Sequence, residues 1–261
     1  MPRYLRIIII VVVTLAIVAA NVMRRNSKVS GIDVVVTYNG CDTLETAARI
    51  GNAVTSQLPT LMNRKIKEVD KQQIERIVSQ SPYLSKSWVT MSLTGKVIVR
   101  AEQRQPIVRV HCADTAFYID SEGISVPLSP VGAADVIVAN GHFDHVPSKE
   151  NGPTDFKQWL KQSKSSHYKL AQLWKLADYL HHDGNTQMSY DQIYIDRKGD
   201  FCLVPHWATF TIVLGDVDRL DEKMEHLERF INRVLPVKGW TAYSEVNLKY
   251  CGQIVCKKSQ Q

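Results

Sequence analysis

The sequence lacks the cysteine pairs and the short catalytic motifs on which many functional assignments depend. Its five cysteines are odd in number and form no C-x-x-C pair, so the sequence predicts neither a disulfide framework nor a zinc site built from paired cysteines. G-x-S-x-G, H-E-x-x-H and a glycine-rich phosphate loop are absent, so the enzymes that carry these motifs are not indicated. We interpret most of the cysteines as small buried apolar residues: Cys41, Cys112, Cys202, Cys251 and Cys256.

The sequence also has no dense run of basic residues. The chain carries 32 Lys and Arg against 26 Asp and Glu, a net charge of +6, but the positive residues are scattered. This distribution does not favour nucleic-acid binding. Arg24, Arg25 and Lys28 lie beside an apolar N-terminal segment, which favours a mild attraction to anionic lipid. The 44% apolar content excludes wholesale disorder.

The most prominent feature that is present is one long apolar run. Residues 7–22 carry no charge, and residues 5–23 would span about 28 Å as a helix, close to the hydrocarbon thickness of a bilayer. We therefore predict a transmembrane helix at 7–23 after a tail at 1–6. A cleaved signal peptide is the alternative, because Ala16, Ala19 and Ala20 approach an A-x-A site. Arginines flank the run on both sides, so the positive-inside rule gives almost no orientation.

The next stretch, of about seventy residues from Ser30 on, predicts a compact α/β unit. Apolar residues alternate with polar ones at 30–36, which predicts a strand. Helices are expected at 44–57, capped by Asp42 or Thr43, and at 70–80, capped by Asp70. A hairpin then fits residues 88–93 and 97–101.

A second, larger unit is expected to begin at Pro106, which a central strand cannot run through. The turn Ser121-Glu122-Gly123 separates two extended runs that follow it. Two helices are expected, at 168–181 and at 220–235, the second capped by Asp216 or Asp218 and ended by Pro236. The remaining pattern is that of short strands, so the fold class is α+β. The expected strands are 107–110, 117–120, 124–128, 136–139, 193–196, 201–204, 209–214, 244–249 and 253–257.

Three weak clusters could carry chemistry. Ser166 and Lys169 match the S-x-x-K pattern of penicillin-recognising enzymes, but its K-T-G partner is absent. Cys202, on an expected strand, and His206, in a loop, are a second possible catalytic pair. A loop at 142–153 offers His142, Asp144 and His145 as metal ligands, although a polar surface loop explains it more simply. None of the three amounts to an active site.

The final pair of strands, at 245–257, is the strongest candidate for a protein-binding surface. The last strand of a chain often lies at a sheet edge, where unpaired N–H and C=O groups accept a strand from another chain. Two other interpretations stay open. The strands can be internal, or Lys249, Lys257 and Lys258 can be there to prevent pairing.

Several runs resemble the bacterial cell-division family FtsQ/DivIB. Residues 69–110 resemble the end of the family's small POTRA domain running into its second domain. The family's E-R-x-P sequence at that boundary corresponds to Gln103-Arg104-Gln105-Pro106. Residues 117–129 resemble its aromatic–aspartate–glycine hairpin. Residues 220–235 and 246–250 are similar to its last helix and strands, where Asp and Arg are common at the positions of Asn247 and Lys249.

The resemblance implies four parts: a cytoplasmic tail at 1–6, a membrane helix at 7–23, a POTRA-like domain at 30–104 and an FtsQ-type β domain at 105–258. It implies an inner-membrane divisome scaffold that is not an enzyme, with its N-terminus cytoplasmic and its body periplasmic. The implied partners are FtsB and FtsL, with no cofactor, metal, nucleic acid or small-molecule substrate. The alternatives are a membrane-anchored periplasmic hydrolase or another POTRA-bearing transport or assembly component. Strand addition would use residues carried over by position: Val246, Asn247, Leu248, Lys249, Tyr250, Gln253, Ile254 and Val255.

Overall fold

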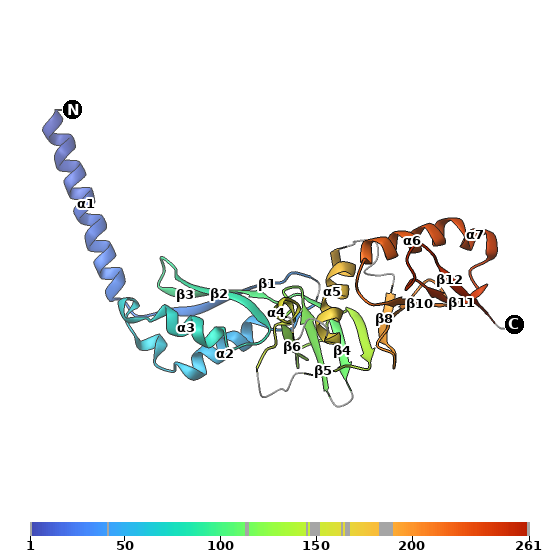
Figure 1. Ribbon diagram of the computed structural model, residues 1–261. Coiled ribbons are helices and arrows are strands. Elements are labelled where there is room, and N and C mark those ends of the chain that lie inside the picture. The colour runs from blue at the N-terminus through green and yellow to red at the C-terminus, as the bar shows by residue number, and fades with distance from the viewer. Residues whose placement is uncertain are drawn as a thin grey trace. The chain divides into compact units, whose positions relative to one another are not determined.

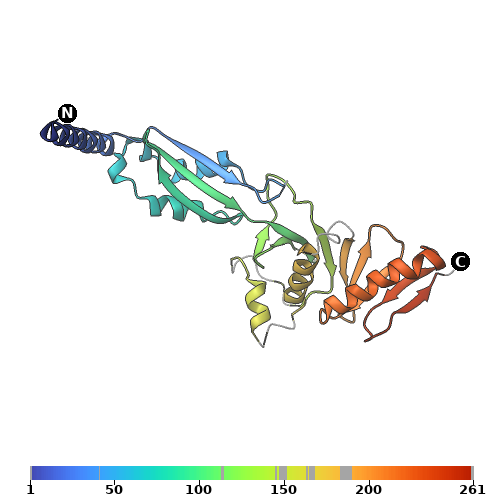
Figure 2. The ribbon, with the colours of Figure 1, turned by 90° about the horizontal axis from the view of Figure 1, so that it is seen from above.

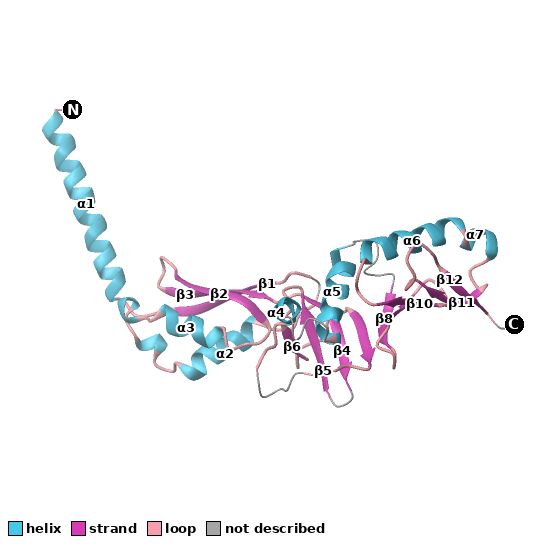
Figure 3. Cartoon of the chain, viewed as in Figure 1, coloured by secondary structure: helices cyan, strands magenta, loops and turns pink. Residues whose placement is uncertain are grey.

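The computed structural model divides the chain into two compact units, Met1–Arg104 and Gln105–Gln261 (Figures 1 and 2). The structure describes residues 2–40, 42–112, 115–144, 146, 152–162, 164, 168–182 and 190–259. The first unit combines helices with a few strands, and strands dominate the second (Figure 3). This confirms the predicted α+β class.

The first unit begins with helix α1, Arg3–Asn26. Residues Arg6–Asn26 are long and apolar enough to cross a membrane, and none of this stretch is buried against the rest of the chain. The predicted apolar helix is therefore confirmed, although it continues three residues beyond its predicted end. A signal sequence would satisfy the same criteria of length and composition.

The rest of the first unit is a three-stranded sheet covered by two helices. Strands β1 (Gly31–Thr37), β2 (Leu84–Met91) and β3 (Lys96–Gln103) lie in the order β1–β3–β2, with β1 parallel and β2 antiparallel to β3. Helices α2 (Ala47–Gln57) and α3 (Lys71–Val78) bury Ile50, Val54 and Ile74 against Val97 and Val99 of the central strand. Short 3-10 turns, η1 (Leu61–Asn63) and η2 (Ile66–Glu68), join the two helices.

Helix α3 has the predicted cap, whereas α2 does not. Asp70 accepts a hydrogen bond from the Gln73 N–H at the start of α3. Helix α2 begins three residues later than predicted and is capped by Thr46, so the expectation of Asp42 or Thr43 was wrong. The reason is tertiary. The N–H groups of Leu44 and Glu45 donate to the buried side chain of Gln103 at the end of β3, which keeps them out of the helix.

The second unit is built on one nine-stranded sheet with the order β12–β11–β10–β9–β8–β7–β4–β5–β6. Most neighbours are antiparallel, but β4–β7, β7–β8 and β10–β11 are parallel. The strand bounds are β4 Pro106–Cys112, β5 Thr115–Asp120, β6 Ser125–Pro127, β7 Ile137–Gly141, β8 Tyr190–Ile195, β9 Phe201–Pro205, β10 Thr211–Gly215, β11 Tyr243–Asn247 and β12 Val255–Lys258.

Four helices, rather than the two predicted, accompany this sheet in the described residues: α4 Phe156–Lys161, α5 Lys169–His182, α6 Leu220–Arg233 and α7 Leu235–Lys238. Helix α4 is too short to show a clear period in the sequence. Pro236 does not end the helical region but lies in the first turn of α7, where its missing N–H costs nothing. Neither Asp216 nor Asp218 caps α6, because Arg219 occupies that position. Asp216 instead binds the buried ammonium of Lys223.

The hydrophobic core of the second unit lies between the sheet and helices α5 and α6. Leu173 and Trp174 of α5 and Leu227 and Phe230 of α6 pack against strand residues such as Ile193. Both helices lie along the sheet in Figures 1 and 2. The core therefore holds α6 next to the last three strands of the sheet.

Gly141 ends β7 where another side chain would not fit. Its φ is +116°, and a Cβ at this position would lie 2.2 Å from the carbonyl oxygen of Ile195 in β8. We expect Gly141→Ala to destabilise the second unit by about 3 kcal/mol or more, because strain and a backbone clash add. Gly252→Ala is the matched control: its φ is +69° but its Cβ would meet nothing within 4 Å. The Gly252→Ala substitution should lower the free energy of unfolding by only about 1–2 kcal/mol. Urea unfolding of both variants measures the difference, and equal losses would contradict this account.

Candidate partner-binding site

Strand β12 forms one edge of the nine-stranded sheet. It pairs with β11 on one side, and no other described strand pairs with it on the other. Strand β11 is internal, because it lies between β10 and β12. The edge expected near the C-terminus is therefore present, but it belongs to β12 alone.

The hydrogen-bond pattern shows which backbone groups face the free edge. Leu248, just after β11, donates its N–H to the Val213 carbonyl of β10 at 2.8 Å. Since successive residues of a strand direct these groups to alternate sides, the preceding Asn247 faces its register partner Val255 in β12. The same alternation turns the N–H and C=O of Cys256 away from β11. The middle of β12 thus presents a donor and an acceptor for another strand.

The structure separates seven of the eight predicted binding residues into two groups, and the eighth, Lys249, forms an ion pair with Asp200. Val246 and Leu248 are buried in the sheet, and Asn247 accepts a hydrogen bond from the Lys249 N–H. These residues hold β11 in place and are not available to a partner. The accessible group consists of Tyr250, Gln253, Ile254 and Val255; the Tyr250 and Val255 side chains are 51% and 46% exposed.

Lys249 fixes the end of β11 to the turn between β8 and β9. Its Nζ binds the Asp200 carboxylate at 2.6 Å, and this hydrogen bond raises the pKa of Lys249 above its ordinary value. The side chain reaches Asp200 by crossing Gly215, where a Cβ would lie 2.6 Å from Lys249 Cγ. Gly215, at φ +77°, supplies the space for this crossing. Lys249 therefore stabilises the fold, and its charge is not placed to prevent strand pairing at the free edge of β12.

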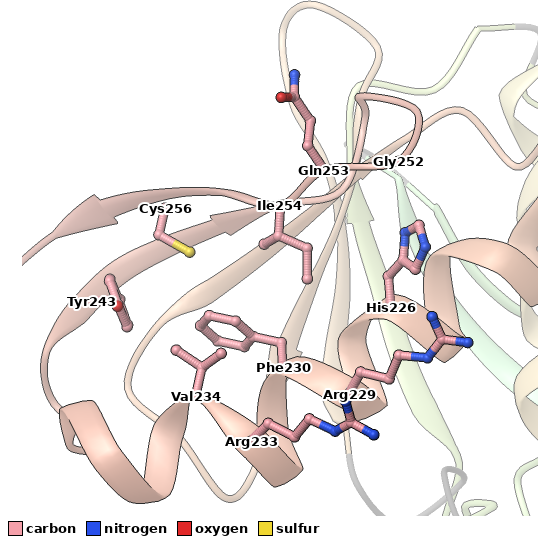
Figure 4. A pocket seen from close by; sticks show the side chains of 10 residues that line it. All are labelled: His226, Arg229, Phe230, Arg233, Val234, Tyr243, Gly252, Gln253, Ile254 and Cys256. Carbon is pink, nitrogen blue, oxygen red and sulfur yellow. The ribbon is translucent and has the colours of Figure 1, made fainter.

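A pocket opens beside β12, between the strand and helix α6 (Figure 4). Its volume is about 620 Å³. Figure 4 shows the Ile254 side chain directed toward Phe230, and Gln253 directed away from it. The lining is apolar toward the sheet and basic along the helix: His226, Arg229, Phe230, Arg233, Val234, Tyr243, Gly252, Gln253, Ile254 and Cys256.

The basic residues on α6 give the mouth of the pocket a positive charge. Arg229 forms an ion pair with Glu225 one turn earlier, so part of its charge is balanced. Arg233, one turn later, is exposed and has no ion-pair partner in the part of the chain that the structure describes. An acidic group bound in the pocket would therefore find in Arg233 a cation whose charge no described ion pair balances.

Of the three weak clusters, only Cys202 and His206 lie wholly within the described residues, and these two do not pair. Ser166 and His145 lie outside the described residues. Lys169 donates its backbone N–H to Asp144 and its Nζ to Gln172, and His206 pairs with Asp191 rather than with Cys202. No group of three or more His, Cys, Asp or Glu suitable for a metal occurs in the described part of the chain.

Sequence reasoning missed the contribution of α6 and of Cys256 to this surface. His226, Arg229, Phe230 and Arg233 recur at intervals of three and four, so one helix face was readable as mixed basic and aromatic. The sequence did not show which strands this helix face would adjoin. That depends on the order of the strands in the sheet, which places β11 and β12 beside α6.

Comparison with known proteins identifies one part of the chain. The family model described as FtsQ/DivIB, C-terminal related, matches residues 105–257. No curated protein matches the chain. The matched range contains helix α6 and the whole nine-stranded sheet except Lys258, the last residue of β12.

Burial makes the cysteines differ in reactivity. It raises the pKa of the Cys112 and Cys202 thiols to about 11, so at pH 8 about one such thiol in a thousand is ionised. Cys251 is exposed. We expect iodoacetamide at pH 8 to alkylate Cys251 at least tenfold faster than Cys202, measured by mass spectrometry of peptides. The difference in alkylation rate between Cys251 and Cys202 should be smaller at pH 10, because the ionised fraction of Cys202 rises with pH. Faster alkylation of Cys202 at pH 8 would instead indicate an activated nucleophile.

Proposed function

The chain belongs to the FtsQ/DivIB C-terminal related family, and on that premise we propose that it is a non-enzymatic scaffold that binds other division proteins along β12. Family membership indicates a scaffold role in cell division. The observation that carries the finer proposal is the open edge of β12, with the N–H and C=O of Cys256 directed outward. Strand addition at this edge would extend the sheet by one strand.

We propose four parts for the chain: a cytoplasmic tail at 1–6, a membrane helix at 7–23, a POTRA-like domain at 30–104 and an FtsQ-type β domain at 105–258. The order β1–α2–α3–β2–β3 of the first unit supports the POTRA-like assignment. The family is membrane-anchored, and α1 has the length and apolarity of an anchor. We propose that this anchor lies in the inner membrane and that both domains are periplasmic.

FtsB and FtsL are the partners that we propose for the β12 edge. Main-chain pairing would supply most of the affinity, because it needs no particular side chain on β12. Specificity would come from the neighbouring pocket, whose apolar floor and basic rim suit a partner segment carrying an apolar residue beside an acidic one. Tyr250, Gln253, Ile254 and Val255 are the predicted contacts that this arrangement retains.

A proline in β12 tests strand addition directly. Cys256→Pro removes an N–H that faces the free edge, and an edge strand tolerates proline at such a position. We expect the variant to lose FtsB binding in a pull-down with purified proteins, while its melting temperature changes little. Cys256→Ala is the control, because it shortens the side chain and keeps the N–H.

The two variants separate main-chain pairing from side-chain contact. If a folded Cys256→Pro protein binds FtsB as well as the Ala variant does, strand addition at β12 is wrong. Leu248→Pro is not a suitable test, because the Leu248 N–H bonds β10 and its loss would disturb the sheet.

Reversing the charge of the pocket rim tests its role. We expect Arg233→Glu to weaken partner binding about tenfold and to reduce the salt dependence of association, since a rim charge acts mainly on the association rate. Lys238→Glu, in the exposed end of α7, changes the net charge equally without touching the pocket. Surface plasmon resonance at two salt concentrations measures both. Equal effects of the two variants would show that only net charge matters.

A further inference from the structure

Two basic segments far apart in the sequence meet where α1 enters the first unit. The Val29 N–H donates to the Arg64 carbonyl at 3.1 Å, and the Ile66 N–H donates to the Ser27 carbonyl at 3.0 Å. This short antiparallel bridge places Lys28 directly opposite Lys65. We use the name basic collar for the cationic side chains of the two segments: Arg24, Arg25, Lys28, Arg64, Lys65 and Lys67.

The bridge places two lysines directly opposite one another. Lys28 and Lys65 form the type of antiparallel pair that is flanked by hydrogen bonds rather than joined by them. In such a pair the Cα atoms lie about 4.5 Å apart and the side chains share one face. Like charges directly opposite one another destabilise a ladder. Both lysines are exposed, so an anion can reach the space between them.

The protein supplies little negative charge to offset this repulsion. Among the residues that the structure describes, no member of the basic collar forms an ion pair. Two carboxylates lie close in sequence, but Glu68 accepts from the Lys65 backbone N–H, and Asp70 caps α3 and pairs with Arg76. The collar therefore retains a net positive charge.

An exposed apolar side chain lies at the same end of the unit. Leu93, in the turn between β2 and β3, is 82% exposed. This turn contacts the bridge, since the Ser30 N–H donates to the Gly95 carbonyl and the Ser30 hydroxyl to the Thr94 carbonyl. Figure 1 shows the turn at the end of the sheet where α1 joins it. Cations beside an exposed apolar residue are typical of a surface that rests on a membrane.

We propose that the basic collar binds the headgroups of anionic phospholipids in the leaflet from which the first unit emerges, with Leu93 entering the interface beside them. The collar begins in the last turn of the apolar helix, where hydrocarbon gives way to headgroups. A phosphate between Lys28 and Lys65 would relieve their repulsion. The proposal rests on α1 being the membrane anchor of the proposed function, but not on which leaflet this is.

Lipid selectivity of the full chain is the test. The protein is reconstituted in phosphatidylcholine vesicles that contain trace spin-labelled phosphatidylglycerol or phosphatidylcholine. Electron spin resonance then measures the fraction of each lipid held against the protein. We expect phosphatidylglycerol to be preferred several-fold. The double variant Lys28→Gln/Lys65→Gln should lose most of this preference, because it removes two of the charges that attract the anionic lipid.

Matched variants make the result specific. Arg197→Gln/Lys198→Gln removes two exposed charges from the turn between β8 and β9 and should retain the preference. The collar variant should also melt at the same or a higher temperature, because it removes a repulsive pair. A held fraction that is equal for both lipids in the wild-type chain would overturn the proposal. If the protein immobilises neither lipid, α1 is not a membrane anchor.

The Leu93 part has its own measurement. Leu93→Trp adds an indole that should be quenched by lipids brominated near the headgroup, beyond the quenching of the wild-type chain. Val237→Trp, at a side chain that is 79% exposed in α7, is the control and should add no quenching. Equal added quenching of both variants, or none at Leu93, would exclude insertion of the turn.

Discussion

The hydrogen bond from the Leu248 N–H to the Val213 carbonyl determines which strand ends the large sheet. It joins the end of β11 to β10 in parallel register, and the Lys249–Asp200 ion pair fastens the following residue across Gly215. With β11 held on that side, β12 can pair only on the other side of β11. The open edge, its outward N–H at Cys256 and its position beside α6 all follow from this one arrangement.

Both candidate surfaces are made by main-chain pairing between segments distant in the sequence. At the β12 edge, the strand order brings Ile254 and Cys256 next to Phe230 and Arg233 of α6. At the end of the first unit where α1 joins it, two backbone hydrogen bonds bring Lys28 next to Lys65. In each place the side chains add a local positive charge that scattered basic residues would not provide. Positive charge at the two surfaces suits acidic segments of a protein and anionic headgroups, respectively.

Local sequence patterns predicted the elements that depend on interactions among their own residues. The three-and-four spacing of Leu170, Leu173, Ala177 and Leu180 predicted α5, and Asp70 caps α3 as its position indicated. Prediction failed where a distant group intervened. Gln103 binds the N–H groups of Leu44 and Glu45 and so delays the start of α2. Prediction also failed at Pro236, which lies in the first turn of the short helix α7 after α6 ends at Arg233.

By itself, the sequence determined the apolar helix, the α+β class, the approximate place of each long element and the resemblance that the match over residues 105–257 confirms. These features depend on composition and on the spacing of apolar residues within a single helix or strand. Only the tertiary structure decided that Val246 and Leu248 are buried whereas Val255 lies at an edge, and that two lysines 37 positions apart face one another. Strand order and register depend on pairing across the chain, which no local pattern encodes.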